Sequence, residues 1–176
     1  MRLILVLLAA SAAAIVAACL LGSVTLPPAR LLAALVGEGT PEDRIVVWLI
    51  RLPRAVAAFT AGAALGLSGA ALQGLLRNPL AEPGVLGVSA CATLAATTTL
   101  YYGLAGASMF ALPFASIAGA LAGTALIAAV ALRTPSVTTL ILIGVGLSSF
   151  AGAIMALLLN LAPNPFSLAD MINWTL

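Results

Sequence analysis

The sequence predicts an all-α membrane protein, a polytopic bundle of about five transmembrane helices. Hydrophobic residues make up 63% of the 176 residues and charged residues only 7%, whereas a soluble domain carries roughly 25% charged residues. Five apolar stretches are long enough to cross about 30 Å of hydrocarbon as helices. Charged side chains fall between those stretches, as expected where a charge at mid-bilayer costs about 2.5–3.5 kcal/mol.

The apolar stretches define the predicted spans, which together form one transmembrane domain over residues 1–176. Helices are expected throughout because an open strand cannot satisfy its backbone polar groups in lipid. The spans are predicted over residues 3–22, 55–76, 84–103, 109–132 and 137–162, with a short terminal helix over 166–176.

The first stretch resembles a secretory signal peptide, because Met1-Arg2 precedes an apolar run and Cys19 ends a segment similar to a lipoprotein cleavage site. The residues that follow Cys19 remain apolar, however, and four further stretches come after them. We therefore predict that residues 3–22 form a permanent span.

Two connections hold most of the polar residues. In the longer one, residues 23–52, prolines and glycines are frequent, and Glu42-Asp43 is expected to begin a short helix that leads to Trp48 as an interfacial anchor. In the shorter one, residues 77–84, the Asn78-Pro79 pair disfavours helix at Asn78. A tight turn is therefore expected between the second and third spans.

Small residues recur every four positions along three of the stretches. Such stripes let helix backbones approach closely in lipid. Helix packing is the first interpretation, and a face that slides or lines a pore is the alternative. The stripes are Gly62, Gly66, Ala70 and Gly74; Ala115, Gly119 and Gly123; and Gly144, Ser148, Gly152 and Ala156.

Ionisable and metal-ligating side chains are scarce. The chain has seven Arg, no Lys, no His and five carboxylates, and Cys19 and Cys91 fit neither a metal nor a disulfide spacing. We expect no catalytic residue, no metal and no cofactor, and no nucleic-acid partner because there is no basic tract. The predicted spans carry no Asp, Glu, Lys or Arg, which argues against a proton-driven pump and fits an energy source outside this chain.

One ordered block is far more specific than the rest. It begins with RLPR at Arg51–Arg54 and continues as GAALGLSGAALQGLLRNPLAEPGVLG over residues 62–87. Similar short segments follow at Leu142–Gly146 and at Asn173–Leu176. This arrangement closely resembles the FecCD-type permease family, the membrane subunits of ABC importers for vitamin B12, heme and iron-siderophores.

The resemblance covers essentially the whole chain but only the first half of a ten-span permease. It implies import of an iron-siderophore, with heme and cobalamin left open, and ATP hydrolysis on a separate subunit rather than on an enzyme site here. The implied partners are a second permease subunit, identical or different, two ATP-binding subunits and an extracytoplasmic substrate-binding protein. The family's coupling loop would lie beyond residue 176, so we expect either a fragment or a truncated product.

The resemblance assigns roles to three groups of residues. Arg51 and Arg54 match arginines that receive carboxylates of the binding protein, with helix-end snorkelling as the alternative. Asn78 and Leu80 match a loop that helps to close the path on the cytoplasmic side, with a plain turn as the alternative.

The third group opens the fifth span. Ser136, Val137 and Thr138 match the start of a helix that lines the path in the family. Ordinary helix capping is the alternative for these three residues.

The resemblance places the protein in the bacterial inner membrane with a cytoplasmic N-terminus. The positive-inside rule prefers the reverse, because four arginines would lie outside and three inside. The acidic residues of the same outer connection partly offset its arginines, so we follow the family. The outer set is Arg30, Arg44, Arg51 and Arg54, offset by Glu38, Glu42 and Asp43; the inner set is Arg2, Arg77 and Arg133.

Two other classes of protein remain as alternatives. A secondary transporter could use similar small-residue helices, and a membrane scaffold without transport activity fits the composition. Neither class requires the ordered arginine and Asn-Pro blocks, and ATP-dependent uptake with partner subunits would separate the importer from both.

Overall fold

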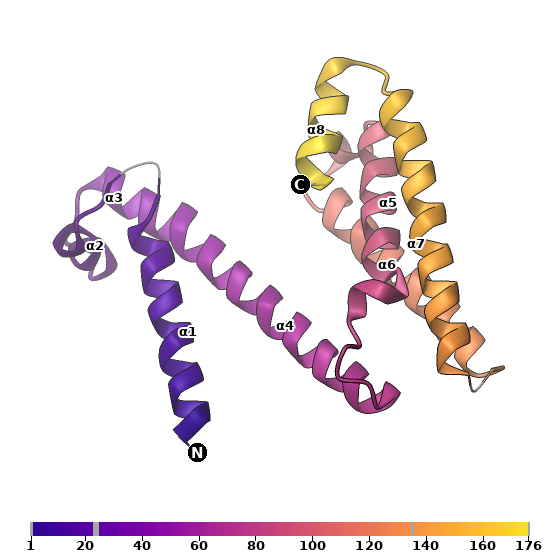
Figure 1. The fold of residues 1–176 in the computed structure, drawn as a ribbon. Helices are drawn as coiled ribbons and strands as arrows, with labels where there is room; N and C mark the ends of the chain where they lie inside the picture. The colour runs from indigo at the N-terminus through magenta and orange to yellow at the C-terminus, as the bar shows by residue number, and fades with distance from the viewer. Residues whose placement is uncertain (1, 23–24, 135, 176) are drawn as a thin grey trace. The chain divides into compact units, whose positions relative to one another are not determined.

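The computed structural model describes residues 2–22, 25–134 and 136–175, and the described chain is helical, with no strand (Figure 1). It forms two compact units, Met1–Leu67 and Ser68–Leu176, and the division falls within helix α4. The predicted all-α fold is confirmed. Four helical segments are long and apolar enough to cross a membrane: Arg2–Leu20, Pro41–Leu76, Ala111–Ala131 and Val137–Asn160.

The first unit begins with α1, Arg2–Leu20, whose side chains are nearly all exposed, as expected of a helix that faces lipid. A short helix that the sequence reasoning missed, α2 over Pro28–Leu35, follows it. Pro27 and Pro28 belong to the polar connection of residues 23–52, where the sequence predicts a short helix only at Glu42-Asp43. Here they occupy the N-cap and the first helical position, where proline has no N–H to lose and its fixed φ suits the helix.

The expected short helix at Glu42-Asp43 is confirmed as α3, Pro41–Ile45. Its N-cap is Thr40, whose hydroxyl oxygen accepts a hydrogen bond from the Asp43 backbone N–H at 3.3 Å. Trp48 lies beyond it and is about half exposed, and its indole Nε1 donates to the carbonyl of Ala34 at 3.2 Å. This bond ties the predicted interfacial anchor to α2.

A π-helical segment, η1 over Val46–Arg51, joins α3 to α4 over Leu52–Leu76. Proline at position 53 cannot donate a backbone hydrogen bond, and its ring crowds the carbonyl four residues before it. The wider π register accommodates this, since the N–H of Leu52 donates to the carbonyl of Val47, five residues back. The predicted span 55–76 is therefore the end of a continuous helical segment, Pro41–Leu76, of 36 residues.

The core of the first unit lies where α1, α2, η1 and the start of α4 meet. Buried apolar side chains from all four elements contact one another there, and Ala34 and Val47 are completely buried. The cluster consists of Cys19, Leu26, Leu31, Ala34, Val47 and Ala55.

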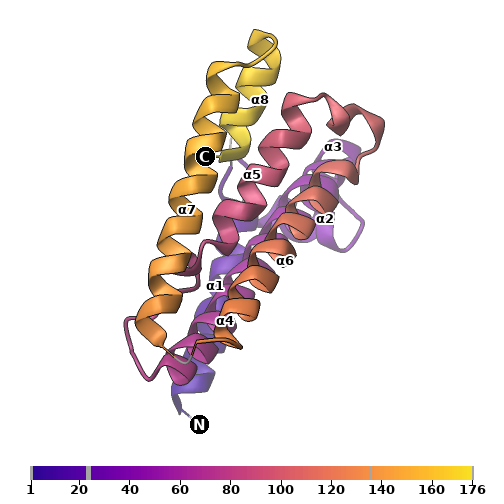
Figure 2. The ribbon, with the colours of Figure 1, turned by 90° about the vertical axis from the view of Figure 1, so that its right-hand side faces the viewer.

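The second unit is a helical bundle centred on α5, Val88–Tyr101. α5 contacts three other helices, α6 over Ala111–Ala131, α7 over Val137–Asn160 and α8 over Pro165–Thr175, as Figures 1 and 2 show. Helices α6 and α7 cover most of the predicted spans 109–132 and 137–162. Helix α8 lies where the short terminal helix was expected, with residue 176 outside the described residues.

The predicted span 84–103 differs from the structure. Its first residues form a 3₁₀ turn, η2 over Pro83–Leu86, and Gly87 then adopts a left-handed φ of 76° before α5 begins. Gly103, with φ of 68°, follows the end of α5 and precedes a second 3₁₀ turn, η3 over Leu104–Ala107. α5 has 14 residues, which is about 21 Å at 1.5 Å per residue and short of the hydrocarbon thickness.

Small residues bring α5 and α6 into close contact. A Cβ added at Gly119 would lie 2.5 Å from the carbonyl oxygen of Cys91, and one added at Gly123 would lie 2.9 Å from its Sγ. At Gly119 the near atom belongs to the backbone, so no larger side chain fits there without separating the helices, whereas at Gly123 the Cys91 side chain would have to shift. The packing interpretation of the small-residue stripe in α6 therefore agrees with the structure.

Candidate functional site

The turn between α4 and η2 is held by the side chain of Asn78. Its Oδ1 accepts a hydrogen bond from the Leu80 backbone N–H at 2.9 Å, and its carbonyl accepts from the N–H of Ala81 at 3.1 Å. Arg77, which precedes it, has a left-handed φ of 49°. These bonds fix a tight, exposed turn that presents Leu80, 86% exposed, at its tip.

The same turn is tied back to the end of α4. The Asn78 N–H donates to the carbonyl of Gln73 at 3.2 Å, and the Gln73 side-chain amide donates to the carbonyl of Ala81 at 3.4 Å. The turn therefore has little freedom relative to the last turn of that helix.

A small cavity of about 60 Å³ connects this turn with α7. Its lining includes Asn78, Leu80 and Leu86 on one side and Ile141 of α7 on the other. Ile141 lies one helical turn beyond Val137. Two of the predicted path segments, the turn and the start of α7, are therefore neighbours in this unit.

The three residues predicted to open the path helix do not line that cavity. Ser136 is the N-cap of α7, and its hydroxyl oxygen accepts a hydrogen bond from the Thr139 N–H at 3.3 Å. This is the geometry of the capping alternative. Val137 and Thr138 are exposed in the first helical turn, so they are open to contact with another subunit or with a passing substrate.

The two predicted docking arginines have different environments. Arg51 is only 7% exposed, and its Nη1 donates to the carbonyls of Cys19 at 2.7 Å and Leu20 at 3.0 Å. These are orphan carbonyls at the C-terminal end of α1, where a cation also meets the negative end of the helix dipole. Arg54 is exposed.

Both arginines border a groove of about 240 Å³ between the end of α1 and the start of α4. Gly22 forms part of its wall, and a Cβ there would lie 2.9 Å from Nη2 of Arg51. The glycine leaves room for the guanidinium to reach the helix end. The structure thus gives Arg51 a role within the fold and leaves Arg54 at the surface of the same groove.

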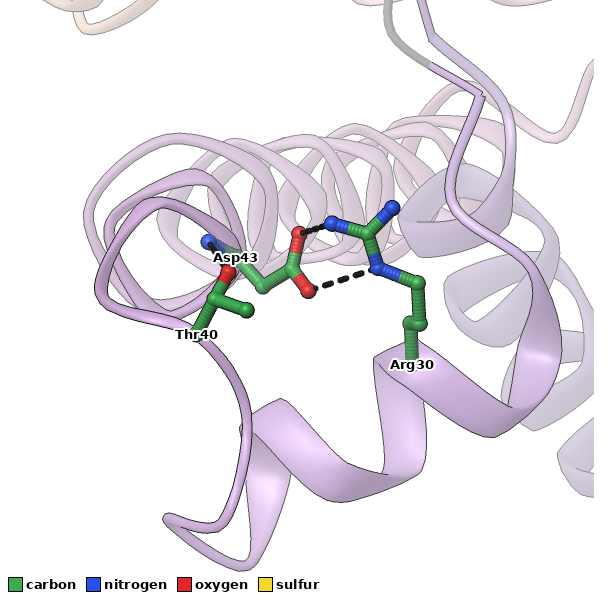
Figure 3. Close-up of polar contacts among 3 residues, drawn as sticks. All are labelled: Arg30, Thr40 and Asp43. Atoms are coloured by element: carbon green, nitrogen blue, oxygen red, sulfur yellow. Dashed lines mark hydrogen bonds and ion pairs between the residues drawn. The ribbon is translucent and has the colours of Figure 1, made fainter.

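The long polar connection contains an ion pair that sequence reasoning missed. Arg30 of α2 and Asp43 of α3 form a bidentate pair, with Nη2–Oδ1 at 2.7 Å and Nε–Oδ2 at 2.8 Å, next to the cap formed by Thr40 (Figure 3). Asp43 is buried and Arg30 is largely exposed. The hydrogen bond to Asp43, followed by the carboxylate charge, raises the pKa of Arg30.

The small-residue stripes are used unevenly within the described structure. A Cβ added at Gly62, Gly66 or Gly74 of α4 would meet no other atom within 4 Å, and Ala70 of that stripe is exposed. In α7, Gly144 is buried against η2, Ser148 lies close to Gly87, and Gly152 meets nothing. Packing of the α4 stripe stays a prediction about contacts outside the described chain.

Long apolar helices joined by charged connections define a polytopic helical membrane protein, and α5, α6 and α7 contain no charged side chain. The chain belongs to the FecCD transport family, whose family model matches residues 6–176. The family resemblance of the sequence is thereby confirmed.

Curated relatives include permeases with different named cargoes. The chain is 42% identical over 80% of its length to an uncharacterized ABC transporter permease protein, YvrB, of Bacillus subtilis, and 34% identical over 88% to its iron(3+)-hydroxamate import system permease protein FhuG. It is 43% identical over 66% of its length to the vitamin B12 import system permease protein BtuC of Escherichia coli. It covers 41%, 48% and 36% of these proteins, respectively, and so spans about half their length or less.

The fold is also similar to a solved structure. A chain described as a metal-chelate type ABC transporter in an inward-facing conformation matches with a TM-score of 0.80 and 28% identity. The match covers 98% of this chain and 52% of that one. Structure and sequence therefore agree on the same family.

Proposed function

We propose that this chain forms part of the transmembrane permease of a binding-protein-dependent ABC importer in the bacterial inner membrane. The family match over residues 6–176 carries the proposal. The physical character of the helices supports it, because α5, α6 and α7 hold no Asp, Glu, His, Lys or Arg, the side chains that usually carry protons through a membrane pump. The energy must then come from partner subunits, and ATP hydrolysis belongs to them.

The proposed cargo is an iron-siderophore or a related metal chelate, with heme and cobalamin as the other members of that class. The support comes from what the relatives are named for, which is import of iron(3+)-hydroxamate or of vitamin B12, and from the metal-chelate type transporter of similar fold. The proposed assembly contains a second permease subunit, two ATP-binding subunits and an extracytoplasmic binding protein.

Uptake into proteoliposomes tests the function and the cargo together. The permease is reconstituted with its ATP-binding and binding-protein partners and offered radiolabelled ferric hydroxamate, heme or cobalamin. Uptake of one chelate that requires both ATP and the binding protein is expected. Uptake driven by a proton gradient without ATP would identify a secondary transporter instead, and a complete absence of uptake would favour the scaffold.

We propose that Asn78 and Leu80 close the path on the cytoplasmic side together with the start of α7, Ser136–Thr138. The cavity between the turn and Ile141 supports this, because it places an exposed apolar tip beside the first turns of the helix. Shortening the side chain at this tip should then widen the closed path. Leu80→Ala is expected to increase leakage of a small solute from proteoliposomes, with Leu132→Ala, an exposed leucine outside the turn, as the matched control.

We propose that the exposed Arg54 receives a carboxylate of the binding protein, and that Arg51 contributes by shaping the groove beside it. A charge-assisted arginine–carboxylate pair supplies attraction and register. Arg54→Glu should weaken binding-protein docking in a pull-down or surface-binding assay, more strongly at low salt. Docking unchanged by Arg54→Glu would exclude this role.

We propose a cytoplasmic N-terminus, with the connection of residues 23–52 outside. The ion pair supports this orientation, since Asp43 neutralises Arg30, and the buried guanidinium of Arg51 is committed to the end of α1. If the paired Arg30 and the buried Arg51 are set aside, Arg44 and Arg54 remain outside against three arginines inside, which lessens the conflict with the positive-inside rule. Glu38→Cys, in an exposed loop, should react with an impermeant maleimide from outside, and reaction from the cytoplasmic face would reverse the orientation.

A further inference from the structure

We propose that Gly87 and Gly144 form a joint through which the turn Asn78–Glu82 moves as one body with α7. The proposal rests on the permease function above and specifies how its cytoplasmic closure would be driven. All of the contacts that carry it lie within the second unit.

The first half of the joint is the surface of α7 at Gly144. This glycine is buried, and a Cβ there would lie 2.5 Å from the carbonyl oxygen of Val85 and 2.7 Å from Cα of Leu86. Both atoms belong to the backbone of η2, so no side-chain rotation could relieve the clash. The backbone of η2 therefore sits directly on the backbone of α7.

The second half is Gly87, which ends η2. Its φ of 76° is strained for any residue with a side chain, and a Cβ there would lie 2.9 Å from the carbonyl oxygen of Gly144 and 3.1 Å from Oγ of Ser148. The Gly87 carbonyl accepts the N–H of Cys91 and so starts α5. Glycine is thus required on both sides of one contact.

Short hydrogen-bonded steps connect this joint to the turn. The Val85 N–H donates to the carbonyl of Glu82 at 3.2 Å, and the Ala81 N–H donates to that of Asn78 at 3.1 Å. Leu80 and Ile141 border the same small cavity. Because the segment between Asn78 and Val85 is short and hydrogen-bonded to itself, it should pass a displacement of α7 on to Leu80.

Other glycines of α7 show that the contact is specific to one position. A Cβ added at Gly146 or at Gly152 would meet no atom within 4 Å. Gly146→Ala therefore provides a matched control for Gly144→Ala, in the same helix and two residues away.

Distances between spin labels test the joint in the complete transporter. Pairs are placed in a background with Cys19 and Cys91 replaced by alanine, and the transporter is reconstituted in lipid nanodiscs with its partner subunits. The first pair joins Leu80→Cys to Leu157→Cys, an exposed position about 24 Å along α7 from Ile141. The second joins Leu80→Cys to Leu8→Cys, an exposed position on α1 in the first unit.

In the otherwise unaltered protein, the turn-to-α7 distance should stay narrow and constant when ATP and the binding protein are added, while the turn-to-α1 distance changes. Gly144→Ala should broaden the distribution of turn-to-α7 distances. The ratio of docked to undocked turn should fall by roughly 5- to 100-fold, the range that an overpacked contact commonly produces. Gly146→Ala should leave it unchanged.

Three results would overturn the joint. They are a turn-to-α7 distance that changes with nucleotide in the unaltered protein, the absence of change in both pairs, or Gly144→Ala behaving like Gly146→Ala. The first two need no variant at the joint, so misfolding of Gly144→Ala cannot hide them. Failure of the proposed function is distinct, because it would appear as absent ATP-dependent uptake whatever the distances show.

Discussion

Arg51 provides the sharpest test of how the first unit is held together. Its guanidinium makes two short hydrogen bonds to carbonyls at the end of α1 while itself 7% exposed. Replacing it with methionine keeps a chain of similar length and removes both bonds. The end of α1 would then be held only by its apolar contacts, and Cys19 would leave the apolar cluster more often.

The magnitude follows from those two bonds. A hydrogen bond to a charged group contributes about 1.5–3 kcal/mol, and the cost of burying the guanidinium offsets part of the sum. We expect Arg51→Met to lower the free energy of detaching α1 by about 2–4 kcal/mol. Because about 1.4 kcal/mol changes an equilibrium constant tenfold, the population with α1 detached should rise by about 30- to 800-fold.

The thiol of Cys19, 6% exposed, reports this opening directly. In a Cys91→Ala background, the rate of labelling by a permeant maleimide should rise by that factor in Arg51→Met and by an intermediate factor in Arg51→Lys, which keeps the charge but not the planar fork. Arg54→Met is the control and should label like the unaltered protein. A rate in Arg51→Met within about threefold of the control would refute the assignment of Arg51 to the end of α1.

The remaining predictions concern the ion pair and the α5–α6 contact. Because Asp43 raises the pKa of Arg30, the stabilisation from this arginine is fully present below its ordinary pKa and is lost only as pH rises through the raised value. Tryptic cleavage after Arg30 should therefore stay slow between about pH 7 and about pH 9. Asp43→Asn should speed it, while Asp170→Asn in α8 should not, and equal cleavage in the two variants would contradict the pair. Gly119→Ala should destabilise the second unit by about 1–3 kcal/mol through overpacking against Cys91, measured by thermal unfolding in detergent. Gly152→Ala, which meets nothing, should be neutral or stabilising by up to about 1 kcal/mol, and equal effects would contradict the close contact.

Composition and hydropathy sufficed to predict the long helices, because a bilayer accepts few alternatives to an apolar helix. They failed where one residue decides the local backbone. Pro27-Pro28 was interpreted as a loop although proline also begins helices, as it does in α2. The span 84–103 was predicted too long because nothing in its apolarity reveals the left-handed Gly87 that separates η2 from α5.

The candidate site was predictable as a set of motifs but not as a set of contacts. The Asn-Pro signal correctly predicted a tight turn, since Asn78 closes it with its own side chain. The two arginines of the RLPR segment are alike in sequence, and only the fold distinguishes them, by folding α1 back until its end meets Arg51. The pairing of Arg30 with Asp43 joins residues 13 apart, a spacing that no helical or strand periodicity would indicate.

The distribution of polar groups is consistent with the proposed joint between Gly87 and Gly144. Among the described residues, the ordered ion pair and the buried arginine lie in the first unit, outside α5, α6 and α7. Hydroxyls in α5 and α6 donate to carbonyls of their own helix, as Thr98, Thr99 and Thr124 do. These helices carry no charged side chain, and among the described residues the buried hydroxyl of Thr97 in α5 has no hydrogen-bond partner. Close packing is therefore the main interaction that we expect to pass a displacement from one helix to the next. We expect a displacement to pass most directly through the backbone contacts at Gly87, Gly119 and Gly144. No side chain lies between the helices there that could rotate and absorb it.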